Sequence, residues 1–181
     1  MPSTTSRTTP PAAITPSNED LRIAYLAALA VAIHVAEAVI PSPLPGVKPG
    51  LANIVVVVAL TLYGWRVAAW VAVLRVLAGG LIAGSLLAPT FFMSAGGTVA
   101  ALAGLAVGRL IPGLGPVGYS ILASLAHILG QFLVAWALFV PHPALWTLLP
   151  LLLTGALILG GVNGILAAGI CRHLKRPGAP P

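Results

Sequence analysis

Long apolar runs, broken by prolines, glycines and single charges, are the feature that most limits what this chain can fold into. Six of them follow one another, at about 21–40, 50–63, 66–87, 90–110, 117–140 and 144–172. None alternates polar and apolar residues as the strand of a membrane barrel does. In hydrocarbon every backbone amide must bond within its own helix or in a closed barrel. The runs therefore predict an all-α integral membrane protein, a bundle of about six transmembrane helices.

The composition also indicates a polytopic membrane protein. Of the 181 residues, 59% are hydrophobic and 7% are charged, whereas a soluble domain has about 25% charged residues. The net charge of +6 comes from cations placed singly between apolar runs, and not from a basic stripe on one face. We therefore expect the lipid bilayer as a partner and no nucleic acid.

The two ends of the chain differ from its apolar middle. Residues 1–20 are rich in Ser, Thr and Pro, and such a segment buries too little surface to order itself. We expect a disordered cytoplasmic tail there, a six-helix transmembrane domain over residues 21–173, and a short basic tail containing proline over residues 174–181.

The lysines and arginines predict how the chain crosses the membrane. With the N-terminus inside, seven cations fall on the cytoplasmic side and one, Lys48, falls outside. The seven are Arg7, Arg22, Arg66, Arg109, Arg172, Lys175 and Arg176. This asymmetry predicts that both termini lie in the cytoplasm.

The second run is unusually short. Its roughly 14 residues span about 21 Å at the helical rise, which is less than the ~30 Å of a hydrocarbon core. Either the preceding GVKPGLAN stretch enters the protein as irregular backbone, or the helix begins below the membrane surface. Irregular backbone is tolerated at that depth only where it is buried in protein or lines a cavity.

Arg75 stands about nine residues beyond Arg66 in the third run, and hence near the middle of the membrane. A charge at that depth costs at least about 2.5–3.5 kcal/mol and normally faces the bundle interior. Two roles remain open. Arg75 binds an anionic ligand, whose carboxylate or phosphate fits the guanidinium fork, or it pairs structurally with Glu37 or with backbone carbonyls.

Three further residues flank the short run on its outer side and are candidates for the same ligand site. These are Glu37, Lys48 and Asn53. The alternative for Glu37 and Lys48 is an interfacial position in water, and the alternative for Asn53 is a helix cap.

His127 and Gln131 are the other candidates for ligand binding, because their four-residue spacing puts them on one helix face. The alternative for both, as for His34 and Asn163, is a hydrogen bond between helices. The sequence has no cluster of His, Cys and Glu at metal-ligand spacing, and we expect no metal and no cofactor.

The first run carries an alanine at every fourth position from residue 24 to residue 36. Such a stripe lets another helix approach closely. Its members are Ala24, Ala28, Ala32 and Ala36. They pack either against a helix of the same chain or against another protein.

Two stretches resemble a known membrane family. GVKPGLANI (46–54) and LYGWRVAAWVAVLRVLAGGLIAGSLLAPTF (62–91) are similar to heptaprenyl diphosphate synthase component I, also called the Gx transporter family. That family is grouped with the substrate-binding S components of energy-coupling factor (ECF) transporters. The resemblance covers roughly residues 21–173. Pro49 departs from the apolar residue expected there, which affects the local loop geometry.

The resemblance implies a multi-pass protein of the bacterial inner membrane. It also implies an outward-facing ligand pocket capped by the loop after the first helix, and docking to a transmembrane T component through small residues of that helix. ATPase subunits would supply energy in trans, since the sequence lacks a Walker loop. The expected function is capture of a small, anionic ligand for import, without catalysis.

The synthase in the family's name finds no support in these residues. A prenyl synthase needs clustered aspartates to hold magnesium and diphosphate, and the only aspartate of this chain is Asp20. A second hypothesis remains, in which the protein is a membrane accessory or scaffold of isoprenoid or quinone metabolism that binds a prenyl diphosphate or a soluble synthase.

Overall fold

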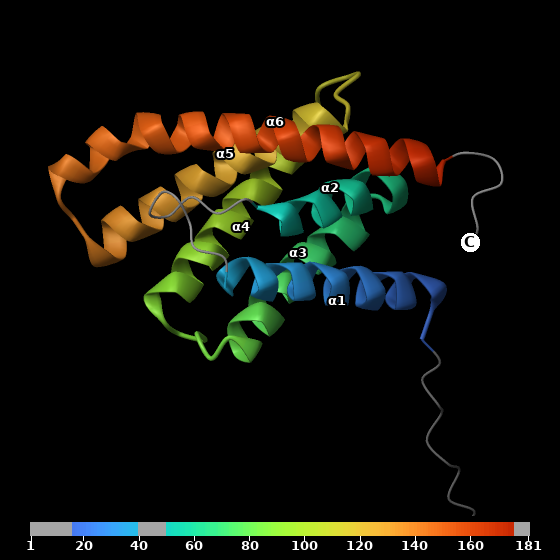
Figure 1. The fold of residues 1–181 in the computed structure, drawn as a ribbon, viewed down its shortest axis with the longest axis horizontal. Helices are drawn as coiled ribbons and strands as arrows, with labels where there is room; N and C mark the ends of the chain where they lie inside the picture. Colours follow the sequence, from blue (N-terminus) through green and yellow to red (C-terminus); the bar gives the residue numbers. More distant parts are fainter. Residues whose placement is uncertain (1–15, 40–49, 176–181) are drawn as a thin grey trace, which may run out of the picture.

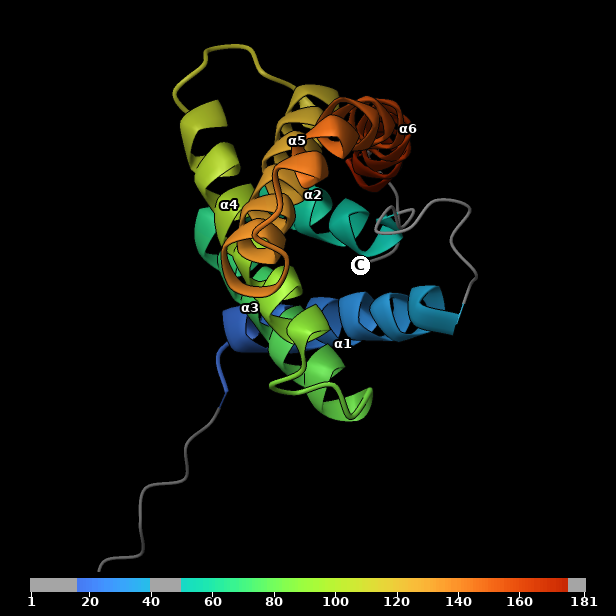
Figure 2. The same ribbon diagram turned by 90° about the vertical axis from the view of Figure 1, so that its left-hand side faces the viewer.

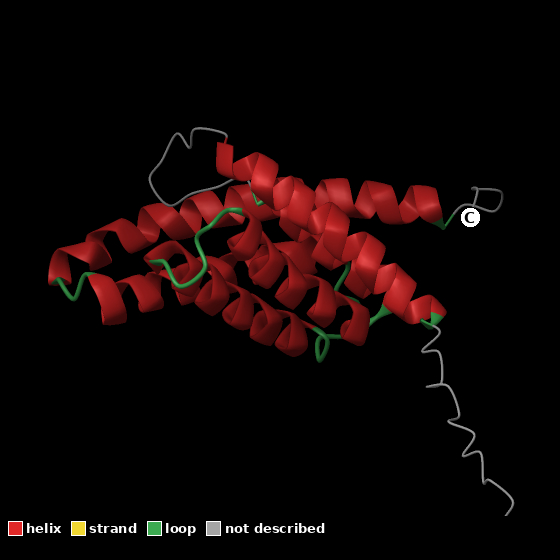
Figure 3. Cartoon of the chain, turned by 90° about the horizontal axis from the view of Figure 1, so that it is seen from below, coloured by secondary structure: helices red, strands yellow, loops and turns green. Residues whose placement is uncertain are grey.

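Six α-helices account for most of the described chain. The computed structural model describes residues 16–39 and 50–175, so Lys48 and the tail segments 1–15 and 176–181 lie outside the described residues. The helices are α1 (Asn18–Val39), α2 (Leu51–Tyr63), α3 (Trp65–Ile82), α4 (Pro89–Gly108), α5 (Pro116–Val134) and α6 (Leu149–Leu174). A π-helical turn, η1 (Ala135–Phe139), and a 3₁₀ helix, η2 (Pro143–Leu148), join α5 to α6. The described residues contain no strand (Figure 3), which confirms the all-α prediction.

Prolines and glycines set the ends of the helices, as the sequence indicated. Gly64 separates α2 from α3 with a φ of 91°, a conformation that favours glycine. Pro89 and Pro116 each begin a helix, where the missing amide proton costs nothing. The third helix ends earlier than predicted, at Ile82 and not at residue 87, because the chain turns at Gly84 with a φ of 63°.

The short helix α2 lies in the middle of the bundle. It contacts α1, α3, α5 and α6, and Figures 1 and 2 show it between α1 on one side and α6 on the other. Every residue from Ala52 to Leu60 is buried. The run of apolar residues without polar alternation is therefore explained by burial on all sides.

Four elements of the described chain are long and apolar enough to cross a membrane. They are Trp65–Ile82, Pro89–Gly108, Pro116–Phe139 and Pro143–Leu174. Of the other two helices, α1 has 22 residues but carries several charges, and α2 has 13 residues, about 20 Å. The predicted six helices are present, whereas the number that span the membrane stays a prediction.

One end of the bundle gathers most of the described cations. Arg22 lies over the ring of Tyr63 at 5.2 Å, and Arg109 lies over Trp65 at 5.4 Å. Both described termini are at this end (Figure 1), and so is the last turn of α6 with its basic residues. This clustering is what the predicted orientation requires of a cytoplasmic face.

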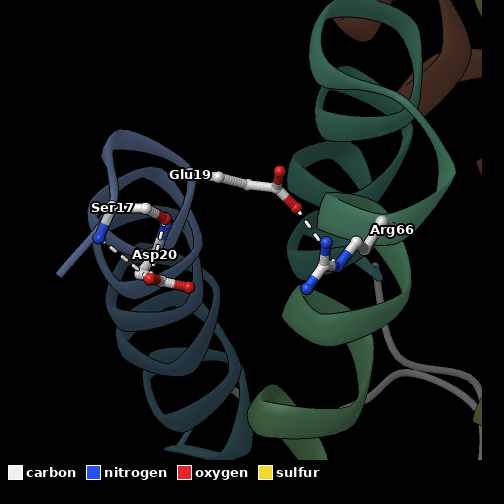
Figure 4. Close-up of polar contacts among 4 residues, drawn as sticks. All are labelled: Ser17, Glu19, Asp20 and Arg66. Carbon is white, nitrogen blue, oxygen red and sulfur yellow. Dashed lines mark hydrogen bonds and ion pairs between the residues drawn. The ribbon is translucent and has the colours of Figure 1, made fainter.

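The first turn of α1 is fixed at the same end (Figure 4). The Ser17 amide and hydroxyl donate to Oδ2 of Asp20 at 2.9 and 2.7 Å, and the Asp20 amide donates back to the Ser17 hydroxyl at 3.1 Å. This reciprocal pattern is a capping box. Beside it, Glu19 pairs with Arg66 of α3 at 3.4 Å. The contacts define where α1 begins and tie it to α3.

Glycines in the described helices mostly serve internal packing. At Gly130 of α5, an added methyl carbon would lie 2.6 Å from the carbonyl oxygen of Gly96 in α4. On α6, a methyl at Gly164 would lie 2.7 Å from the Cα of Val117 in α5. Gly161 has open space instead. The backbones of α4, α5 and α6 therefore approach one another closely at these points.

Candidate functional site

The start of α2 is held by polar groups from α1 and α6. The amide of Leu51 donates to Oε1 of Glu37 at 2.6 Å, and the amide of Ala52 donates to Oε2 at 3.5 Å. The side-chain amide of Asn163 donates to the carbonyl oxygen of Gly50 at 3.3 Å. A carboxylate at a helix N-terminus satisfies amides that have no partner in the helix and is stabilised by the helix dipole.

Two alternatives that the sequence left open are wrong, namely an interfacial Glu37 and a capping Asn53. Glu37 is 4% exposed and does not stand in interfacial water. Asn53 does not cap α2, because the N-cap residue is Gly50 and the Asn53 amide donates to the Gly50 carbonyl at 2.9 Å. Asn53 is buried within the first turn of the helix. Leu51 at the start of α2 is 37% exposed, and burial begins at Ala52. Residues 46–49 lie outside the described residues, so both interpretations of the short run stay predictions.

Arg75 lies inside the bundle, which confirms its predicted placement. Its side chain is 6% exposed, and its Nη2 donates to Oγ1 of Thr98 on α4 at 3.4 Å. Within the described part of the chain its Nε is buried with no hydrogen-bond partner. Glu37 is near enough to act on Arg75 electrostatically, but the contact is not an ion pair. The cation therefore has donor capacity that the described residues do not use.

His127 and Gln131 come together on α5, as their spacing predicted. Both face the backbone of Gly97 on α4. A methyl carbon on Gly97 would lie 2.9 Å from Nε2 of His127 and 2.7 Å from Cγ of Gln131. Nδ1 of His127 is buried without a partner among the residues described. His127 is also within electrostatic range of Arg75.

These contacts form one polar cluster, to which all six helices contribute. Its members are Glu37 of α1, the Gly50–Ala52 backbone at the start of α2, Arg75 of α3, Thr98 of α4, His127 and Gln131 of α5, and Asn163 of α6. The one carboxylate of the cluster, that of Glu37, accepts from the α2 amides, so the buried guanidinium of Arg75 and several hydrogen-bond donors remain available to a ligand. Chemically this set favours an anion. The described residues hold no group of three or more side chains fit for a metal.

The alanine stripe of α1 faces outward. Ala24, Ala28, Ala32 and Ala36 are all exposed. The first three line an apolar groove of about 590 Å³ between α1 and α3, whose other wall includes Leu74 and Ala78. The residues that pack α1 onto the bundle lie on other faces. His34, for example, fits against Gly79, where a methyl carbon would lie 2.8 Å from its ring.

Two members of the cluster were not identified from the sequence. Thr98 is a single hydroxyl in an apolar helix, and its position directly after two glycines was the available signal, because glycines permit a close approach by α5. The amides at the start of α2 are backbone groups, so no residue type in the sequence marks them. They join the cluster only because Glu37 of α1 lies against the first turn of the short helix.

A comparison with known protein families now gives the identity of the chain at the family level. Residues 26–170 match the family model described as heptaprenyl diphosphate synthase component I. No curated protein and no solved structure matches the chain significantly. Since the match covers most of the 181 residues, the chain belongs to the heptaprenyl diphosphate synthase component I family.

Proposed function

We propose that this protein is the substrate-binding membrane subunit of an ECF-type importer. In this role it captures a small anionic ligand from the extracytoplasmic side and performs no catalytic step. A T component and ATPase subunits act as partners in trans. The inner membrane of a bacterium, with both termini in the cytoplasm, is the proposed location.

One observation carries the proposal, namely the buried and incompletely paired charge of Arg75. The chain has three acidic side chains. Glu37 is the one that lies near Arg75, and its oxygens receive the α2 amides. A buried charge without full hydrogen bonding is costly, and an anionic ligand would offset that cost. The unpaired Nδ1 of His127 and the adjacent Gln131 add polar groups suited to orienting such a ligand.

The exposed alanine face supports the proposed assembly with a T component. Helices in lipid associate through close backbone approach at small residues, since there is no hydrophobic driving force between them. The groove beside Ala24, Ala28 and Ala32 offers such a surface on the outside of the bundle.

A second candidate function follows from the printed family name. The protein would be a membrane accessory component that binds a prenyl diphosphate or a soluble synthase. The anion-favouring cluster suits a diphosphate as well as a carboxylate. Purification with and without added farnesyl diphosphate, followed by native mass spectrometry, separates the two. A co-isolated water-soluble anion favours import, and retention of the prenyl diphosphate favours the second function.

The test of the site is Arg75→Lys, measured with the anion that native mass spectrometry identifies. Lysine keeps the charge but loses the planar fork, so affinity should fall at least about tenfold, the value of one charged hydrogen bond. Arg109→Lys, at the cation-rich end of the bundle, is the matched control and should bind like the wild type. Equal affinity of all three proteins would leave Arg75 with a structural role alone.

The test of assembly is Ala28→Trp or Ala32→Trp. Either variant should stay folded and bind ligand but should not co-purify with the T component. Ile158→Trp is the control, because Ile158 is 61% exposed on α6 and does not line the groove beside the alanine stripe. If the alanine variants assemble as well as the control, the stripe is not the docking surface.

A further inference from the structure

A second groove lies at the cation-rich end of the bundle, away from the polar cluster. It has a volume of about 490 Å³ and forms where the end of α2, the beginning of α5 and the last turns of α6 meet. Its lining includes Thr61, Val117, Ile165, Ala168, Arg172 and Lys175. The groove therefore combines apolar walls with two cations from the same end of α6.

These two cations have no acidic side chain of this chain available to them. The sequence has three such side chains, and all of them lie elsewhere. Glu19 pairs with Arg66, Asp20 is bonded to Ser17, and Glu37 receives the α2 amides. Arg172 and Lys175 are both exposed, so they can attract an anion other than these three side chains.

The other cations at this end differ from Arg172 and Lys175 in their surroundings. Arg22 and Arg109 lie over aromatic rings at 5.2 and 5.4 Å, contacts that stabilise a cation without an anion. Arg172 and Lys175 instead line a groove with apolar walls.

Helix dipoles do not cancel this positive charge. The carboxyl ends of α6 and α2 each contribute about half a negative charge, and together they are less than the two positive charges of Arg172 and Lys175. The beginning of α5 lies at the same groove through Pro116 and Val117, and it has no side-chain cap. It contributes about half a positive charge. The net field in the groove favours an anion.

We propose that this groove binds an anionic phospholipid. The phosphate lies between Arg172, Lys175 and the first turn of α5, and one acyl chain runs along Ile165 and Ala168. The position supports a lipid over a soluble anion, since α6 is apolar enough to span the membrane and its basic end then lies at headgroup depth. Basic grooves between helices at that depth are typical sites for anionic headgroups. This inference does not depend on the proposed transport function.

The experiment uses the full chain in a neutral detergent and native mass spectrometry. Phosphatidylglycerol is titrated against phosphatidylcholine of the same acyl chains, and the first lipid bound is quantified. We expect the phosphatidylglycerol preference of the wild type to fall about fivefold for each charge removed, so that Arg172→Gln with Lys175→Gln lowers it about 25-fold. Ala168→Phe, which fills the groove and keeps both cations, should abolish the tight binding of phosphatidylglycerol.

The control removes the same charge from the same end of the bundle. Arg22→Gln with Arg109→Gln should keep the preference, and circular dichroism checks that each variant is helical. The proposal would be overturned by no phosphatidylglycerol preference in the wild type, by an equal loss in the control pair, or by displacement of the lipid by inorganic phosphate. Displacement of the bound phosphatidylglycerol by farnesyl diphosphate would also overturn it, in favour of a prenyl ligand. If Ala168→Phe does not fold, the charge variants decide.

Discussion

Removing the carboxylate of Glu37 tests whether the start of α2 depends on it. In Glu37→Ala the amide of Leu51 loses its acceptor at 2.6 Å, and that of Ala52 loses a longer contact at 3.5 Å. Glu37 is 4% exposed, so water does not readily replace it. Arg75 also loses the one carboxylate within its electrostatic range. We expect the protein to become less stable.

The magnitude comes mainly from the shorter bond. A hydrogen bond to a charged acceptor contributes about 1.5–3 kcal/mol, and a buried amide left without a partner costs about 1–3 kcal/mol. A contact of 3.5 Å is at the limit of a hydrogen bond and adds little. Glu37→Ala should therefore lower the free energy of unfolding by about 2–4 kcal/mol. Glu37→Gln keeps an acceptor oxygen without the charge and should cost about half as much.

The assay is reversible unfolding in mixed micelles, in which SDS is titrated and helicity is followed by circular dichroism. Glu19→Ala is the control, because its ion pair with Arg66 is largely exposed, with the side chains 43% and 77% accessible. Such surface pairs contribute less than about 1 kcal/mol. If Glu37→Ala costs no more than Glu19→Ala, the carboxylate does not support α2 and our account of the site's architecture is refuted.

Three further predictions concern packing, protonation and orientation. Gly130→Ala should lower thermal stability, because the methyl would lie 2.6 Å from the Gly96 carbonyl oxygen, whereas Gly161→Ala meets nothing within 4 Å and should be neutral or stabilising. Hydrogen bonds from Ser17 hold the pKa of Asp20 below its ordinary value of 3.8, so the contribution of this cap persists above that pH and is lost as the pH falls through the lower folded-state pKa. In Ser17→Ala, NMR titration should show the pKa rising toward 3.8, and an unchanged pKa would contradict the capping role. A tag at the C-terminus should resist an impermeant reagent in intact cells, and its labelling would refute a cytoplasmic terminus.

Fold class and helix positions follow from the sequence because they depend on local signals. Pro89 and Pro116 mark helix starts and Gly64 marks a turn, and these effects act within a few residues. The burial of Arg75 was also predictable, since a charge within a membrane-spanning run normally faces the interior of the bundle. The pairing of His127 with Gln131 followed from helix periodicity alone.

The partners within the site were not predictable, because they come from distant parts of the chain. Asn163 bonds to a carbonyl 113 residues away, and no local pattern encodes that contact. Glu37 looked interfacial, since its neighbours in sequence lead into a proline-rich stretch. Its burial depends on where α2 begins in space. Thr98 became the partner of Arg75 only through the packing of α3 beside α4.

The central position of α2 has a consequence for the order in which the protein is made. A 13-residue helix is too short to be held in the bilayer as an independent span, and α6, which covers part of its surface, is made only after α3, α4 and α5. Until then, the Gly50 carbonyl lacks the Asn163 side chain, and the apolar face that α6 covers has no protein neighbour. Biogenesis of this membrane protein therefore cannot be completed helix by helix, because α2 acquires its final environment only after four later helices have been made.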